Sequence, residues 1–82
     1  MPCTEFDEFI IRCLKEYSGC TCPYITLKWM EHIGMKYTEW NYHHRLQQTN
    51  RHMKTLEKYG IVRYTGRTVS MSDRSKIWEL IQ

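Results

Sequence analysis

Apolar side chains recur at a helical period near the start of the chain. From Phe6 they follow at offsets of 3, 4, 7, 8 and 11 residues, the last being Tyr17. This spacing places them on one stripe of a helix with 3.6 residues per turn. Thr4 is a natural N-cap with Asp7 three residues later as a partial capping box, and Gly19 is a natural stop. The pattern predicts a first helix between Thr4 and Gly19.

Pro23 interrupts the helical pattern, because proline lacks an amide donor and restricts the residue before it. We therefore expect a loop around Pro23 that leads into a very short strand near residues 24–25. Thr26 is then a natural N-cap and Gly34 a natural stop. These signals predict a second helix over residues 27–33. Its inward side chains are expected to be Leu27, Met30 and Ile33.

Neither glycine nor proline interrupts the chain between Thr38 and Gly60. One helix over residues 39–58 is the preferred interpretation, with Thr38 as its N-cap and Gly60 as a left-handed stop. The alternative is a separate short helix over residues 38–45, followed by another that begins near Gln47. At 100° per residue, the inward face of the single helix holds Tyr42, Leu46, Thr49, Met53 and Leu56. The opposite face holds Trp40, Asn41, His44, Gln47, Gln48, Arg51, Thr55 and Lys58.

The period changes to that of a strand after Gly60. A first strand is expected over residues 61–64, and Gly66 is expected to mark a bulge or bend. Val69 and Met71 are expected to resume the strand before the turn-forming residues 72–75. The last periodic segment, residues 75–81, is expected to be the second strand.

A resemblance to a known family is found around the end of the third predicted helix. The run NRHMKTLEKYGIVR, residues 50–63, resembles the end of the recognition helix and the start of the wing in bacterial and archaeal winged helix-turn-helix transcriptional regulators. The segment KIWEL, residues 76–80, is similar to their final strand. The resemblance and the order of the elements predict an α+β fold with three helices and a small antiparallel β wing, as one domain over residues 1–82. The stretch from the second helix to Gly60 is longer than usual in the family, and no helix after the wing is available for dimerisation.

The charge is distributed unevenly along the chain. Residues 1–34 contain five acidic and three basic side chains, a balance of −2, whereas residues 35–82 contain nine basic and four acidic ones, a balance of +5. The positive charge therefore lies on the third helix and the wing, where a surface that binds a polyanion requires it. A solvated basic face without a ligand is the alternative interpretation.

The resemblance implies that the outward face of the third helix enters a DNA major groove. Glutamine makes paired hydrogen bonds with adenine and arginine with guanine, through base edges that this groove exposes. Residues expected to read bases are His44, Gln47, Gln48 and Arg51. Residues expected to hold backbone phosphates are Lys54, Lys58, Arg63, Arg67, Arg74 and Lys76. For the two glutamines, an ordinary solvated helix face is the alternative.

The cysteines and histidines suggest a metal site only weakly. The spacing of Cys20 and Cys22 is not that of a paired C-x2-C site, and Cys13 is better explained as a core residue. The weak candidate ligands are therefore Cys13, Cys20 and Cys22. We expect reduced thiols, no bound cofactor, and little burial of Cys20 and Cys22 in a loop. Their joint replacement by serine is expected to change stability little.

Enzymes and membrane proteins have little support in this sequence. It contains no glycine-rich phosphate loop, nucleophile elbow or H-E-x-x-H motif, and no apolar run long enough to span a bilayer. The first residues do not form a signal peptide, so we expect a cytoplasmic protein.

The function expected from these observations is sequence-specific binding of double-stranded DNA by a small transcriptional regulator. A homodimer on a palindromic site is common for such proteins, although no dimer element is evident. One rival is a winged helix used as a protein-interaction module, with an exposed aromatic patch that includes Trp29, Tyr37 or Trp40. The other is a metal- or redox-responsive switch built on Cys20 and Cys22.

Overall fold

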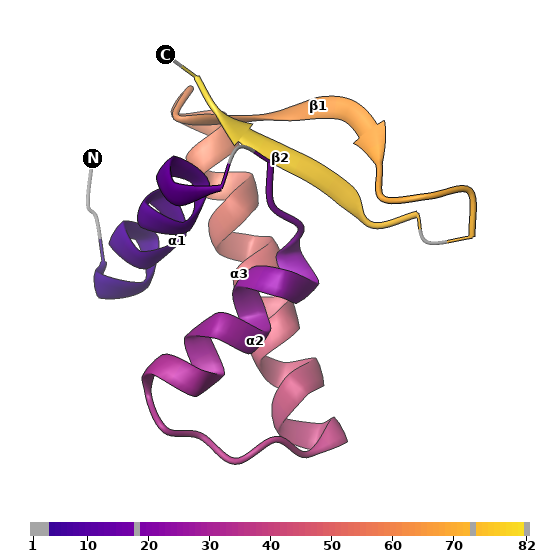
Figure 1. The fold of residues 1–82 in the computed structure, drawn as a ribbon. Helices are drawn as coiled ribbons and strands as arrows, with labels where there is room; N and C mark the ends of the chain where they lie inside the picture. Colours follow the sequence, from indigo (N-terminus) through magenta and orange to yellow (C-terminus); the bar gives the residue numbers. More distant parts are fainter. Residues whose placement is uncertain (1–3, 18, 73, 82) are drawn as a thin grey trace.

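The fold is known from a computed structural model, which describes residues 4–17, 19–72 and 74–81. Three helices precede a two-stranded antiparallel sheet (Figure 1). In chain order the elements are α1 (Glu5–Glu16), α2 (Cys22–His32), α3 (Glu39–Lys58), β1 (Val62–Thr68) and β2 (Lys76–Leu80). In the described residues this α+β arrangement confirms three helices followed by a small antiparallel sheet, and it is compatible with a winged-helix layout.

The predicted starts of α1 and α3 are confirmed by their caps. The Thr4 hydroxyl accepts a hydrogen bond from the Asp7 amide at 3.2 Å, and the Asp7 carboxylate accepts one from the Thr4 amide at 3.0 Å. Thr38 caps α3 by accepting from the amide of Asn41 at 3.0 Å. α3 is one continuous helix of 20 residues, so the preferred single-helix interpretation is confirmed.

The prediction for α2 is wrong at its start. The expected loop and short strand before Thr26 are replaced by helix from Cys22 onwards, with Thr21 as the N-cap. Pro23 lies in the first turn, where a helix needs no amide donor and where the fixed φ of proline suits it. Thr26 is therefore a buried residue inside the helix instead of its cap.

The earlier start also corrects the inward face of α2. Met30 is buried as expected, but Leu27 and Ile33 are exposed. The helix instead buries Ile25 and Trp29. The predicted end is close to the observed one, since Gly34 has a positive φ of 71° just beyond the helix.

The wing is formed by β1 and β2. Their register pairs Val62 with Leu80 and Tyr64 with Trp78, and it becomes irregular between Tyr64 and Thr68. Gly66, with a φ of +86°, lies in this irregular stretch, as expected for a bulge. The strand does not resume at Val69 and Met71, which are exposed and follow the end of β1. In the expected turn over residues 72–75, Asp73 lies outside the described residues.

The segment before α2 is attached to the wing. The amide of Cys20 donates to the carbonyl of Trp78 at 3.0 Å, and the amide of Trp78 donates back to Cys20 at 2.8 Å. Cys20 therefore forms an isolated antiparallel bridge on the free edge of β2. This short extended contact precedes the position where the sequence predicted a strand.

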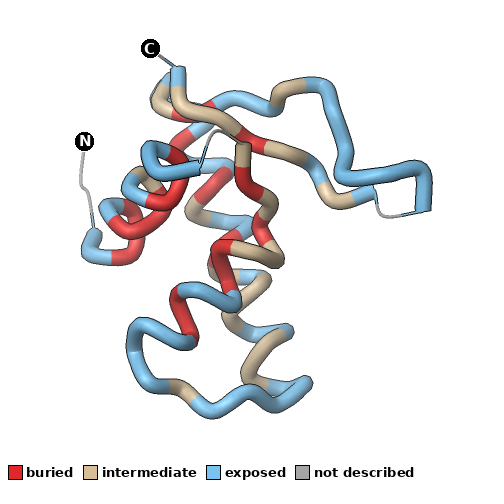
Figure 2. The backbone as a smooth tube through the Cα atoms, viewed as in Figure 1, coloured by how far each residue is buried: buried red, intermediate tan, exposed pale blue. Residues whose placement is uncertain are grey.

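The core lies beneath the sheet, where α1, the inward face of α2 and the C-terminal half of α3 meet (Figure 2). The end of α2, the following turn and the start of α3 extend away from it and are mostly exposed. The main buried apolar residues are Phe6, Phe9, Ile10, Leu14, Ile25, Trp29, Met30, Met53, Leu56, Val62 and Trp78.

Gly19 is the most crowded of the four glycines. Its φ is +94°, and an added Cβ would lie 2.8 Å from Cγ2 of Ile77. Gly60 has a φ of +75° but open space around a Cβ, so Gly60→Ala measures backbone strain alone. We expect Gly60→Ala to lower the free energy of unfolding by about 1–2 kcal/mol. Gly19→Ala should lower it by about 1–3 kcal/mol more, because the methyl group also overpacks the core.

Urea unfolding of both variants beside the unchanged protein would measure the difference. Equal losses of stability would contradict the prediction and would mean that Ile77 moves aside without strain.

Candidate nucleic-acid interface

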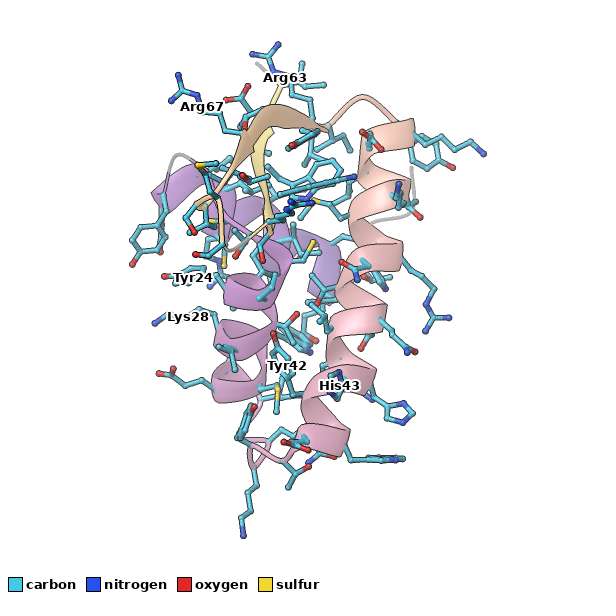
Figure 3. The ribbon with its side chains drawn as sticks, turned by 90° about the vertical axis from the view of Figure 1, so that its right-hand side faces the viewer. Tyr24, Lys28, Tyr42, His43, Arg63 and Arg67 are labelled. Carbon is cyan, nitrogen blue, oxygen red and sulfur yellow. The ribbon has the colours of Figure 1, made fainter. Side chains whose placement is uncertain are left out.

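Only one side of α3 is buried, and mainly in its C-terminal half. Thr49, Met53 and Leu56 are buried, while Tyr42 and Leu46 are half-buried on the same face. The predicted inward face is therefore confirmed. In Figure 3, α2 and α3 stand side by side, with the other side of α3 free of neighbouring elements. A helix of this length extends over about 30 Å, so the free side is long enough for an extended contact surface.

A pair of threonines fixes α3 against α2. Oγ1 of Thr26 and Oγ1 of Thr49 lie 2.8 Å apart, and both side chains are fully buried. The Thr26 hydroxyl also lies 2.7 Å from the carbonyl oxygen of Cys22, and that of Thr49 lies 3.0 Å from the carbonyl oxygen of Arg45. Two hydroxyl protons thus share three acceptors, so both hydroxyls remain hydrogen-bonded inside the core.

The four predicted base-reading residues lie together on α3. His44, Gln47 and Arg51 are exposed, and their spacing puts them on one stripe of the helix. Gln48 is half-buried on the flank, where its Oε1 accepts from Nη1 of Arg45 at 3.0 Å. All four line a hollow of about 580 Å³ between α3 and the N-terminal end of α1.

Asp7 and His52 lie in the same hollow, and the sequence analysis assigned neither to it. Nδ1 of His52 is 2.6 Å from Oδ1 of Asp7, which ties α3 to the first turn of α1. Burial would raise the pKa of Asp7. The hydrogen bond from His52 and those from the amide and hydroxyl of Thr4 outweigh burial and lower this pKa below its usual value. No sequence pattern indicates this pair, because its members are 45 residues apart.

The predicted phosphate-binding residues fall into separate groups. Lys54 and Lys58 are exposed on α3. Lys54 and Lys76 both line a second hollow of about 390 Å³ between α3 and β2, whose lining includes Met53 and Trp78. Lys76 also lies over the ring of Tyr64, with Nζ 5.3 Å from the ring centroid.

The remaining wing cations lie away from that hollow. Nε of Arg63 is 2.6 Å from Oε1 of Glu79, so this cation already has an anionic partner. Arg67 and Arg74 are exposed. Figure 3 shows Arg63 and Arg67 at the wing end of the molecule, far from Tyr42 and His43 near the start of α3. The wing arginines and the α3 stripe therefore do not form one continuous patch.

The weak metal candidates Cys13, Cys20 and Cys22 are buried free thiols. The expectation of unburied loop thiols is wrong, because Cys20 bridges β2 and Cys22 begins α2. Burial, with a smaller contribution from Cys13, raises the pKa of Cys20 to about 11. Burial also raises the pKa of Cys22 to about 11, despite the opposing charge of Lys76. Within the described residues, no group of three or more histidine, cysteine or acidic side chains is arranged to hold a metal ion.

Comparison with known proteins found no relative of this chain. No protein-family model, curated protein or solved structure matches the chain. Among the helices in the described part of the chain, none combines the length and the apolar character needed to cross a bilayer.

The Asp7–His52 contact predicts a particular dependence of stability on pH. A carboxylate whose folded pKa is lowered stabilises the fold above its unfolded pKa, and this contribution disappears as pH falls through the folded value. We expect Asp7→Asn to lower the free energy of unfolding by about 1.5–3 kcal/mol at neutral pH. The difference from the unchanged protein should vanish as the pH falls below the usual Asp value of 3.8.

Denaturant unfolding at a series of pH values would measure this difference. Glu8→Gln, which removes an exposed acid in the same helical turn, is the matched control. A loss for Asp7→Asn that is the same at every pH would contradict an ionised, hydrogen-bonded carboxylate.

The buried cysteines should react slowly with thiol reagents. A rise of the pKa to about 11 for Cys20 and Cys22 leaves roughly 100-fold less thiolate at pH 8 than an ordinary cysteine has. In a Cys3→Ser background, labelling by a disulfide reagent should therefore be about 100-fold slower for the folded chain than in denaturant. Rapid labelling that zinc suppresses would restore the metal hypothesis.

Proposed function

We propose that this chain is a winged helix-turn-helix protein that binds double-stranded DNA, with α3 in the major groove and the wing along the backbone. The stripe on α3 carries the proposal. His44, Gln47 and Arg51 are exposed in line along the helix, and the cations Lys54 and Lys58 follow towards its C-terminal end. These are side chains that bind base edges and phosphates.

The stripe contains cations and neutral polar groups but no carboxylate. The two acids of α3 are Glu39 and Glu57, at its two ends. At 100° per residue, Glu57 lies roughly 120° around the helix from Arg51. The carboxylate that lines the same hollow as Arg51 is Asp7 of α1, which is paired with His52. The charge balance of +5 in residues 35–82 also attracts a polyanion such as DNA.

The dimensions of α3 suit this docking. A helix with its side chains is about 10–12 Å wide, and the major groove of B-DNA is about 12 Å wide. The N-terminal half of α3, which carries His44 and Gln47, extends beyond the core (Figure 1). Arg51 lies further along, beside the N-terminal end of α1. Arg51 and Gln47 then read bases, whereas Gln48, held by Arg45, supports the stripe from its flank.

The phosphate contacts are assigned to cations that form no ion pair with a carboxylate of the described residues. Lys54 and Lys76 border the hollow between α3 and β2, where a DNA strand leaving the major groove would pass. Lys58 on α3 and the wing residues Arg67 and Arg74 are exposed and would contact phosphates separately from this hollow. Arg63 contributes less, because Glu79 already neutralises its charge. Such a domain would act as a small cytoplasmic transcriptional regulator without a cofactor.

One observation favours a second candidate function, a protein-interaction module. Of the three aromatic residues expected in an exposed patch, Tyr37 and Trp40 are exposed at 58% and 70%. Trp29, however, is buried in the core. This candidate predicts weak DNA binding that does not saturate.

Salt-dependent titration of the whole chain with duplex DNA tests the proposal. If about five phosphates are neutralised, log K should fall with log salt with a slope of about −4 to −5.

Arg51→Ala should lower affinity for a preferred site by about 1–3 kcal/mol and relax selectivity at one base pair. Arg67→Ala should weaken preferred and scrambled DNA equally and lower the slope by about one. Arg63→Ala is the matched control and should change the slope less than Arg67→Ala, because Glu79 neutralises Arg63.

A flat salt dependence, or no binding at low salt, would reject the proposal in favour of the interaction module. A uniform loss for Arg51→Ala together with altered base preference for Arg67→Ala would mean that the wing, and not α3, reads the sequence.

A further inference from the structure

The start of α3 presents an aromatic pair to solvent. Trp40 is 70% exposed, whereas the other two tryptophans, Trp29 and Trp78, are exposed by only 9% and 5%. The ring of His44, one helical turn later, contacts the Trp40 ring with their centroids 4.0 Å apart. An indole held in this way is exposed but already restrained, so less side-chain freedom remains to be lost when a ligand stacks on it.

This pair is continuous with the stripe proposed to contact DNA. Trp40, His44, Gln47 and Arg51 follow at offsets of 0, 4, 7 and 11 residues, the spacing of one helix face. Aromatic rings that alternate with cations along one surface are typical of proteins that bind single-stranded nucleic acid, where bases stack on the rings and cations follow the backbone.

A fully double-stranded ligand offers no base face on which this indole could stack. In a duplex, bases offer the major groove only their edges, because their faces are stacked on one another. An unpaired base has a free face, and stacking it on an aromatic side chain is worth about 1–3 kcal/mol. A surface that binds only duplex would leave an exposed tryptophan in contact with solvent or with phosphates.

We propose that Trp40 and His44 form a stacking site for an unpaired nucleobase, so that the preferred ligand is a duplex with an adjoining single-stranded segment. The inference rests on the proposed function, since it requires α3 to lie along nucleic acid. The duplex part contacts Arg51 and Lys54, and the unpaired part reaches the start of α3.

The helix geometry fixes where the junction should lie. Eleven residues separate Trp40 from Arg51, and at 1.5 Å per residue the two are about 16 Å apart along the helix axis. With about 3.4 Å per nucleotide along a strand, this distance corresponds to roughly five nucleotides. The unpaired base should therefore lie about five nucleotides from the base pair that Arg51 contacts.

The continuity of the stripe favours nucleic acid over a protein partner. A protein docking on aromatic side chains would bury a compact apolar patch. Instead, the neighbours of the pair along the stripe are Gln47 and Arg51, which are polar and exposed.

The experiment compares three nucleic acids with the full chain: a blunt duplex, the same duplex with a single-stranded overhang of about five nucleotides, and the overhang strand alone. Binding is followed by anisotropy of labelled nucleic acid and by tryptophan fluorescence, to which Trp40 contributes the solvent-exposed signal. The unchanged chain should bind the overhang duplex about 10-fold or more tighter than the blunt one, with quenching of Trp40.

The variants are Trp40→Ala, Trp40→Phe and, as a matched control, Tyr59→Ala at the other end of α3, where Tyr59 is 53% exposed. Trp40→Ala should bind both duplexes equally, with the affinity for blunt duplex unchanged. Trp40→Phe keeps a ring and should keep part of the preference. Tyr59→Ala should keep all of it. Circular dichroism verifies that each variant is folded.

Several outcomes would overturn the inference. Equal binding of blunt and overhang duplexes by the unchanged chain, with salt-dependent binding intact, rejects the stacking site and leaves the proposed function standing. No binding to any of the three nucleic acids rejects both. Self-association that Trp40→Ala abolishes would assign the aromatic pair to contact with a second copy of this chain.

Discussion

The position of α3 depends on a hydrogen bond between two buried hydroxyls, those of Thr26 and Thr49. A made hydrogen bond in a core contributes only about 1 kcal/mol, but a buried hydroxyl without a partner costs about 1–3 kcal/mol. The bond is therefore more important for selecting one arrangement than for total stability. If α3 slid along α2 by one residue, the hydroxyls would separate. Threonine is also small enough to let the two helix backbones approach closely where they cross.

The Thr26–Thr49 hydrogen bond lies near the middle of α3, and the two halves of the helix on either side of it differ in burial. The C-terminal half is held by Thr49, Met53 and Leu56 in the core, and the Asp7–His52 contact restrains its rotation from the α1 side. The N-terminal half has no fully buried residue, and only Tyr42 and Leu46 on its inward face are half-buried apolar residues. The outward side chains of this half therefore point in directions that the helix geometry sets. This is how a rigid scaffold can present a stripe of polar and aromatic groups away from the core.

Local signals predicted much of this fold, and long-range pairings account for what they missed. α1 and α3 were predictable because caps and periodicity agreed. The start of α2 was not, because Pro23 marks either a break or a first turn, and only the packing of Ile25 and Trp29 decides between them. The outward residues of α3 follow from the helical period. That Glu79 neutralises Arg63 requires the strand register, and the burial of Cys20 requires its bridge to Trp78.

The bridge between Cys20 and Trp78 has a consequence for the order of folding. β2 is the last element, yet it completes the sheet with β1 and also fastens the segment in front of α2. Contacts between residues so distant in sequence form slowly, because closing a long loop loses chain entropy before the contact is gained. During synthesis, β1 and the segment in front of α2 therefore remain without this partner until β2 has emerged. The fold is therefore completed late, when Trp78 of β2 forms its bridge to Cys20.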